Sequence, residues 1–184
     1  MAPSFDQIKQ ILNNGTSSEK ISILSELTET DANEIVSEII KMLDDIEIQV
    51  RGEAFSTLVL NPNDISKILI NHLTSESKNI RSFSILVLAN RNDITASAEI
   101  AKLTNDESSM VRSCALGGLG HMNAKEFSKN IHDCFSDSNI EVKRSALFAA
   151  ICIGDKISLE EISKLKEEND SEIEKILNMK NNSL

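Results

Sequence analysis

Residues 106–119 read DESSMVRSCALGGL, an acidic residue followed by an apolar residue and a base, and then by apolar residues at helical spacing. The apolar–base pair at the centre of this stretch recurs along the chain at an almost constant interval. The four copies are Val50-Arg51, Ile80-Arg81, Val111-Arg112 and Val142-Lys143, in steps of 30, 31 and 31 residues. Such a period is typical of stacked structural repeats, in which each unit contacts its neighbours. The sequence therefore predicts a repeat architecture before it says anything of function.

Each copy of the pattern predicts an amphipathic helix. Counted from the Val or Ile as zero, positions +4, +5 and +8 are mostly apolar. At about 100° per residue these positions fall with 0 and +7 on one face of a helix, which we expect to be packed. Positions +2, +3, +6 and +9 fall on the opposite face and vary in character.

A second helical pattern precedes each of these helices, so each unit is predicted to be a helical hairpin. The first helices are expected over 32–43, 64–73, 93–103 and 124–135. An acidic or small polar residue lies in the turn, five positions before the Val or Ile, where it can cap the following helix or face the repeated base. These turn residues are Asp45, Ser75, Asp106 and Asp137.

The pattern is degenerate at both ends of the chain, as expected of terminal repeats that face water. Six units of about 31 residues account for nearly all of the 184 residues. We expect one domain, 1–184, with repeats at about 4–28, 32–60, 63–90, 93–121, 124–154 and 158–180. Capping-box spacing at Ser4 and Ser158 predicts that helices of the end units begin at Phe5 and Leu159.

The pattern Asp-x4-Val-Arg-x2-Ala-x3-Leu, found at 45–58, 106–119 and, with Lys for Arg and Ala for the last Leu, 137–150, resembles the HEAT repeat. More narrowly it is similar to the HEAT-like variant named after the phycobilisome lyases. The resemblance covers essentially the whole chain and is strongest over 32–155. It implies an all-α fold, an α-solenoid of about six stacked helical hairpins whose second helices line the concave side of a right-handed superhelix. It also implies a ladder of acids and bases between neighbouring units, here Arg51, Arg81, Arg112, Lys143, Asp45, Asp106 and Asp137.

Composition agrees with a soluble helical protein. Hydrophobic residues make up 40%, with two Pro and neither Trp nor Tyr. No apolar run approaches the roughly 20 residues of a membrane span, and the N-terminus lacks the features of a leader, so we expect a cytoplasmic protein. The 29 acidic residues exceed the 19 basic ones, and the resulting net charge of −10 argues against free nucleic acid as a ligand.

Cysteine and histidine usage gives no reason to expect a metal or a cofactor. The cysteines lack Cys-x-x-Cys spacing, and the histidines are isolated from one another and from a neighbouring Glu. A HEAT-like di-iron enzyme, deoxyhypusine hydroxylase, uses His-Glu pairs, which this chain lacks. No catalytic set and no bilin-binding set is apparent either. The residues considered are Cys114, Cys134, Cys152, His72, His121 and His132.

The run Gly-Gly-Leu-Gly at 117–120 closes a predicted helix, whereas a phosphate-binding loop precedes one. Gly120 is interpreted as a helix C-cap. Gly117 and Gly118 lie inside the helix, where each costs about 1 kcal/mol relative to Ala. Either Gly118 permits close approach of a neighbouring helix, or Gly117 lets the backbone of a partner come close.

The variable face of the second helices carries apolar residues that packing does not require. A contiguous patch of these would indicate an interaction site for a helix or an extended peptide. The acidic surroundings would favour a basic, amphipathic partner. The candidate partner-binding face comprises Glu53, Ser56, Val59, Phe83, Leu86, Cys114, Gly117, Arg144, Phe148 and Ile151.

The sequence thus predicts a non-enzymatic scaffold or adaptor that binds another protein on the concave face of the solenoid. One alternative is a lyase-like enzyme or accessory factor acting on a bound chromophore or cofactor. That alternative needs a closed pocket with convergent polar groups, which the variable positions do not supply. The other alternative is a regulatory subunit of another enzyme. The sequence identifies neither the partner nor the oligomeric state.

Overall fold

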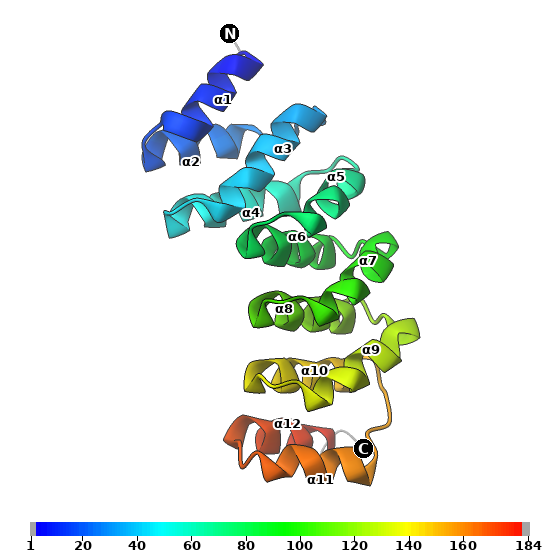
Figure 1. The fold of residues 1–184 in the computed structure, drawn as a ribbon. Helices are drawn as coiled ribbons and strands as arrows, with labels where there is room; N and C mark the ends of the chain where they lie inside the picture. Colours follow the sequence, from blue (N-terminus) through cyan, green and yellow to red (C-terminus); the bar gives the residue numbers. More distant parts are fainter. Residues whose placement is uncertain (1–2, 182–184) are drawn as a thin grey trace. The chain divides into compact units, whose positions relative to one another are not determined.

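The computed structural model describes residues 3–181, and side chains to residue 178. Within this range the chain is built from α-helices, short 3-10 helices and loops, and no strand occurs between residues 3 and 181. The helices form successive hairpins (Figure 1). This confirms the predicted all-α class and the α-solenoid of stacked hairpins. The hairpins are α1 (Phe5–Asn14) with α2 (Ser17–Glu26), α3 (Asn33–Lys41) with α4 (Ile48–Leu60), α5 (Ser66–Asn71) with α6 (Lys78–Asn90), α7 (Ser97–Lys102) with α8 (Ser109–His121), α9 (Ser128–Asp133) with α10 (Ile140–Cys152), and α11 (Leu159–Glu167) with α12 (Ser171–Asn181).

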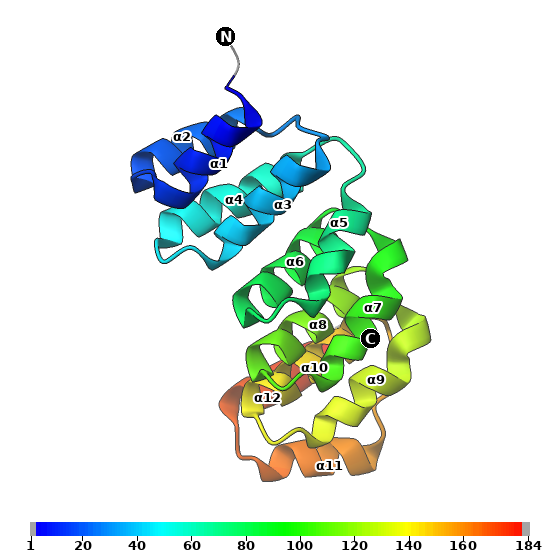
Figure 2. The same cartoon turned by 45° about the horizontal axis from the view of Figure 1, so that its top comes forward.

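The described residues divide into two compact units, one ending at Arg91 and the other beginning at Asn92. In the first unit the second helices α2, α4 and α6 contact one another in chain order, and so do the first helices α1, α3 and α5 (Figure 2). In the second unit α8 contacts α10, and α10 contacts α12 (Figure 1). Stacking of hairpins therefore builds the core within each unit.

The second helices α4, α6, α8 and α10 each have 13 residues, because the same apolar pattern directs the same packing in every repeat. In α8, for example, Val111, Ala115 and Leu119 are fully buried. These residues occupy positions 0, +4 and +8, which lie within about 80° of one another on a helix. The predicted packed face is thus the buried face at these positions.

The first helices of the middle repeats are shorter than predicted, because 3-10 turns flank a brief α-helical stretch. In the fourth repeat α7 lies between η3 (Ile94–Ala96) and η4 (Leu103–Asn105), where one continuous helix was expected. The two helix types share the spacing of apolar residues at i and i+3, so the sequence pattern does not separate them. The turn residue then closes η4, because the amide of Asp106 donates to the carbonyl of Leu103 at 3.2 Å.

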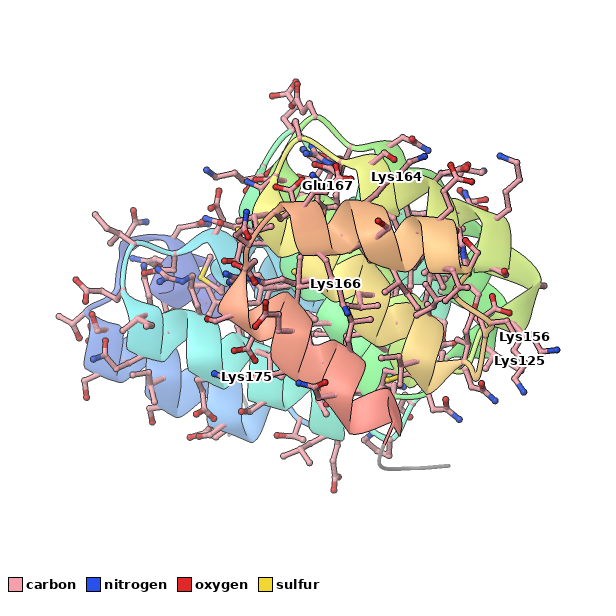
Figure 3. All side chains as sticks on the ribbon, turned by 90° about the horizontal axis from the view of Figure 1, so that it is seen from below. Lys125, Lys156, Lys164, Lys166, Glu167 and Lys175 are labelled. Atoms are coloured by element: carbon pink, nitrogen blue, oxygen red, sulfur yellow. The ribbon has the colours of Figure 1, made fainter. Side chains whose placement is uncertain are left out.

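Capping boxes begin α1 and α11 at Phe5 and Leu159, as predicted. A third box, formed by Thr16 and Glu19, begins α2 and was not identified in the sequence. On the last hairpin, Lys164, Lys166 and Glu167 project from α11 and Lys175 projects from α12 (Figure 3). These charged side chains give the terminal hairpin a polar outer surface, in which Leu159 is an apolar exception at 86% exposure.

The interpretation of Gly120 as a C-cap is wrong. The residue is buried within the last turn of α8, which continues to His121. A Cβ atom on Gly120 would lie 2.9 Å from the Cα of Ala149 on α10, so the absence of a side chain lets the two backbones approach. A close helix contact, which was expected at Gly118, is observed at Gly120, and Gly118 is also buried in α8. Asn123, with φ 52°, supplies the left-handed residue after the helix.

Candidate functional site

Each repeat arginine binds the turn that precedes its own helix. The Nη1 of Arg51 donates to the carbonyls of Asp45 and Ile46 at 2.7 and 3.0 Å. Arg112 binds the carbonyls of Asp106 and Glu107 in the same way, at 2.8 and 3.2 Å. These carbonyls have no partner within a helix, so the guanidinium group satisfies backbone acceptors that the turn leaves open.

Arg81 repeats this arrangement, because its Nη1 lies 2.8 Å from the carbonyl of Ser75 and 3.0 Å from that of Glu76. The side chains of the turn residues also stabilise the start of the next helix. The carboxylate of Asp106 accepts from the amide of Ser108 at 2.8 Å, and the hydroxyl of Ser75 accepts from the amide of Ser77 at 3.3 Å. Ser75 thus holds the structural place of the turn acid.

Arg112 and Lys143 also reach an acid at the turn of the following repeat. Arg112 is bidentate with Asp137, with Nε to Oδ2 at 2.7 Å and Nη2 to Oδ1 at 2.9 Å. Burial alone would raise the pKa of the Asp137 carboxyl. The hydrogen bonds from Arg112 and from the amide of Asn139 lower that pKa by more, so it lies below its ordinary value. The pair is therefore ionised at neutral pH. Lys143 contacts Glu168 at the corresponding place.

The first repeat contributes a base that the sequence reading missed. Lys20 binds Asp45 at 2.7 Å, and both side chains are largely buried. A step of 31 residues back from Arg51 reaches Lys20, and the same step forward from Asp137 reaches Glu168. The period itself therefore held the signal for both residues.

The face of the second helices in the first unit is hollowed between α4 and α6. The hollow has a volume of about 390 Å³ and is open to solvent. Its wall is apolar except for one guanidinium group. The rings of Phe55 and Phe83 meet edge to face across it, with centroids 6.4 Å apart. The lining residues are Ile48, Arg51, Gly52, Phe55, Phe83 and Leu86.

Five of the residues assigned to the candidate partner-binding face lie in this unit. Phe83 and Leu86 line the hollow. Glu53 and Val59 are half-buried on α4 and Ser56 is exposed, and these three do not line it.

Sequence reasoning missed the part of the hollow wall that α4 contributes. Phe55, at position +5, was expected on the packed face, yet it is half-buried, whereas Ile85 and Leu116 at the same position are fully buried. Position +5 lies about 140° from position 0, at the edge of the packed face, so a large ring there extends out of the core. Ile48 lies two residues before position 0, where no apolar residue was assigned to either face, and is 66% exposed.

The other five candidate residues lie in the second unit. Gly117 and Phe148 are exposed, Phe148 by 52%, and no atom lies within 4 Å of a Cβ built on Gly117. Cys114 and Ile151 are half-buried. Arg144 is bound within the chain, with Nε 2.9 Å from Asp170 and Nη1 2.6 Å from Glu141.

A second hollow, of about 380 Å³, lies between the turns around Asp106 and Asp137 and is polar. Its charged groups include the Arg112–Asp137 pair already described. Burial raises the pKa of the Cys134 thiol in its wall to about 11, so the thiol is neutral near pH 7 and a poor nucleophile. This hollow therefore holds a structural ion pair and no activated group in its described wall.

His132, isolated in the sequence, contacts two carboxylates in the fold. Its Nδ1 lies 2.7 Å from Glu161 and its Nε2 lies 3.3 Å from Asp155. The Ser128 hydroxyl donates to Asp155 and not to the imidazole, so the cluster differs from a serine–histidine pair. The contacts connect α9 with the start of α11.

Among residues 3–181, no group of three or more His, Cys, Asp or Glu side chains is placed to hold a metal ion. None of the helices in that range is long and apolar enough to cross a membrane.

A family model described as HEAT repeats matches residues 66–151. This confirms the resemblance inferred from the repeated pattern, for HEAT repeats in general. No curated protein is similar enough to match the chain.

Solved structures with similar folds are all distant in sequence. An engineered protein is 15% identical with a TM-score of 0.59, and the alignment covers 97% of both chains. A designed armadillo repeat protein in complex with the peptide (KR)4 is 17% identical with a TM-score of 0.52, covering 97% of this chain and 98% of that one. Computationally designed armadillo repeat proteins for modular peptide recognition are 16% identical, with a TM-score of 0.52 and coverage of 98% and 100%. At these identities the likeness is one of fold.

Proposed function

We propose that this chain of HEAT repeats is a scaffold or adaptor that binds another protein, seating a helix or an extended segment in the hollow between α4 and α6. This proposal is supported mainly by the solvent-open apolar wall that Ile48, Phe55, Phe83 and Leu86 form. Apolar area left in water costs about 25 cal/mol per Å². A partner that covers the hollow recovers this free energy, and aromatic side chains in such pockets commonly anchor protein interfaces.

Similar folds lend this proposal a precedent. The designed armadillo repeat proteins are described as peptide-binding or as made for peptide recognition. Stacked second helices offer a surface that an elongated segment can follow from one repeat to the next. The hollow crosses from α4 to α6 and so spans two neighbouring repeats.

The proposed activity is binding rather than catalysis, and the proposed compartment is the cytoplasm. The net charge of −10 favours a partner that is basic overall, because opposite charge accelerates encounter. The apolar anchor supplies most of the affinity in this proposal, and long-range charge contributes mainly to the rate of association.

Affinity capture from the source cells, with quantitative mass spectrometry, tests the proposal. Phe83→Ser and Leu86→Glu each remove apolar wall from the hollow. Leu60→Ser is the matched control, because Leu60 is 69% exposed on α4 and does not line the hollow. We expect a partner that the wild type and the control capture equally and that both hollow variants lose by tenfold or more. Circular dichroism establishes that each variant is folded.

Equal capture of every partner by the folded hollow variants would exclude this surface as the binding site. In that case exposed apolar residues of the second unit, such as Phe148, would be the next to substitute.

A further inference from the structure

We propose that the segment bound in the α4–α6 hollow places a carboxylate, next to a large apolar side chain, against the guanidinium group of Arg51. This inference rests on the proposed function and specifies the chemistry of the partner.

Arg112 shows how the repeat arginine is bound when the next repeat supplies a turn acid. Its Nη1 binds the carbonyls of its own turn, and its Nε and Nη2 form a bidentate pair with Asp137 of the next repeat. Arg51 binds its own turn in the same way through Nη1. The next repeat, however, has Ser75 where the acid would be, and a serine hydroxyl cannot form the bidentate pair.

The Nε and Nη2 of Arg51 consequently make no hydrogen bond with residues 3–181, and no carboxylate in that range lies within 4 Å of the group as an ion-pair partner. Asp45, the acid of its own turn, is bound by Lys20 at 2.7 Å. Glu76, which follows Ser75, is exposed. One positively charged donor edge therefore remains available, and it belongs to a residue that lines the apolar hollow.

The position of this group restricts what can cover the hollow. A purely apolar segment would remove water from the guanidinium without replacing its hydrogen bonds, and an unpaired buried charge is costly. A carboxylate on the same segment restores two charge-assisted hydrogen bonds of the kind observed between Arg112 and Asp137. Gly52 lies beside Arg51 with no atom within 4 Å of a built Cβ, which leaves room for the backbone of the segment.

The occupant is thus an acidic residue adjacent to a large apolar residue in another protein. A partner that is basic overall is compatible with this, because net charge acts over the Debye length, about 8 Å at physiological salt, whereas the bidentate pair is formed at contact. A second copy of this chain is disfavoured as occupant by its own charge of −10.

A display library of random 12-residue peptides, selected on the full-length chain, tests the chemistry directly. We expect enriched peptides to share an Asp or Glu next to Leu, Ile, Phe or Trp. Synthetic peptides from the selection are then compared with versions in which Gln or Asn replaces the acid, by fluorescence anisotropy. The acid should contribute about tenfold or more to affinity for the wild type, and little for Arg51→Gln.

Ser75→Asp is the sharper variant, because it recreates the acid that Arg112 has in Asp137. We expect Asp at position 75 to pair with Arg51, which raises the midpoint of thermal unfolding and weakens acidic peptides by about tenfold. Arg112→Gln is the control, since it breaks the equivalent pair in the second unit and should leave peptide affinity unchanged. An effect on binding that accompanies higher stability cannot be attributed to misfolding.

Three outcomes would overturn the inference. If selected peptides lack an acid yet lose binding with Phe83→Ser, the hollow is a protein-binding site of another chemistry and the proposed function stands. If no selected peptide depends on Phe83, both proposals are wrong. If sedimentation shows a dimer that Phe83→Ser abolishes, the occupant is a second copy of this chain.

Discussion

The two glycines at the ends of the Gly117–Gly120 run differ only in what surrounds them. No atom lies within 4 Å of a Cβ built on Gly117, whereas a Cβ on Gly120 would lie 2.9 Å from the Cα and 3.2 Å from the Cβ of Ala149. Both residues are inside α8, where glycine disfavours the helix relative to alanine. At Gly120 the cost is offset by the approach of α8 to α10, whereas at Gly117 no described atom comes close enough to the built Cβ to offset it.

Alanine substitutions at these two positions should therefore have opposite effects. We expect Gly117→Ala to increase the free energy of unfolding by about 0.5–1 kcal/mol, because it removes backbone entropy from the unfolded chain. Gly120→Ala should decrease it by about 1–3 kcal/mol, because α8 and α10 must move apart. Urea unfolding monitored by circular dichroism measures both values. A stabilising Gly120→Ala would show that the helix approach is not limited by this residue.

At the scale of the element, the second helices end in two different ways. After α8 and α10 the chain turns through a left-handed residue, Asn123 with φ 52° and Gly154 with φ 74°. The amide that follows then bonds a carbonyl five residues back, 3.0 Å from Ala124 to Leu119 after α8. The equivalent of these left-handed residues after α4 is Pro62, whose ring fixes φ near −65° and prevents this ending.

A side chain replaces the missing backbone motif after α4. Arg91, at the end of α6, donates Nη1 to the carbonyl of Leu58 at 3.1 Å and also to that of Asn61, and Nη2 to that of Asn63 at 2.7 Å. One guanidinium group thus satisfies carbonyls that would otherwise lack a partner.

Arg91→Leu should consequently lower the free energy of unfolding by about 2–4 kcal/mol, because several backbone acceptors lose charged donors. Arg91→Lys should recover only part of this, since an ammonium group cannot present the same planar fork. Thermal unfolding compares the two variants with Lys102→Leu, a change at an exposed base that pairs with Glu99 on the surface. Equal midpoints for Arg91→Leu and the control would contradict the capping role of Arg91.

The sequence was a good guide to these elements where a rule is local. Capping boxes predicted the starts at Phe5 and Leu159, and apolar spacing predicted the packed positions of the second helices. Local rules do not predict that Arg91 reaches α4 from a different repeat, because that contact joins residues about thirty positions apart. Helical spacing alone likewise assigned Phe55 to the core. The hollow that Phe55 lines depends on how α4 packs against α6, which the spacing within one helix does not specify.

At the scale of the whole molecule, the carboxylates at the repeat turns bind bases of neighbouring hairpins and also make stability depend on pH. The sequence predicted a ladder from the turn acids, but which acid meets which base depends on distances between hairpins. The pKa values of Asp45 and Asp137 are lowered because hydrogen bonds from Lys20 and Arg112 outweigh the opposing effect of burial. Burial also opposes ionisation of Glu161, yet hydrogen bonds from His132 and Ser158 lower its pKa to about 2.

These lowered values determine the direction of the response to acid. A carboxylate whose pKa is lower in the folded chain than its ordinary value, 3.8 for Asp or 4.5 for Glu, stabilises the fold fully above that ordinary pKa. The unfolded chain takes up protons first as the pH falls, so the contribution decreases from about pH 4.5 and is lost near pH 2 for Glu161. Protonation also leaves the ladder bases without their partners.

We therefore expect the urea midpoint to be nearly constant between pH 7 and 5 and to fall steeply between pH 4.5 and 2. Asp137→Asn should lower the free energy of unfolding by about 2 kcal/mol at pH 7, because it removes the charge that Arg112 binds. The deficit should shrink as the pH falls below about 3.8, because the unfolded wild-type chain then takes up a proton at Asp137 that the folded chain resists. Asp133→Asn is the control, since Asp133 is exposed and pairs with Lys129 on the surface, where such pairs contribute little. A deficit for Asp137→Asn that stays constant down to pH 2 would mean that its cause is packing, because a charge-dependent contribution must vanish with the charge.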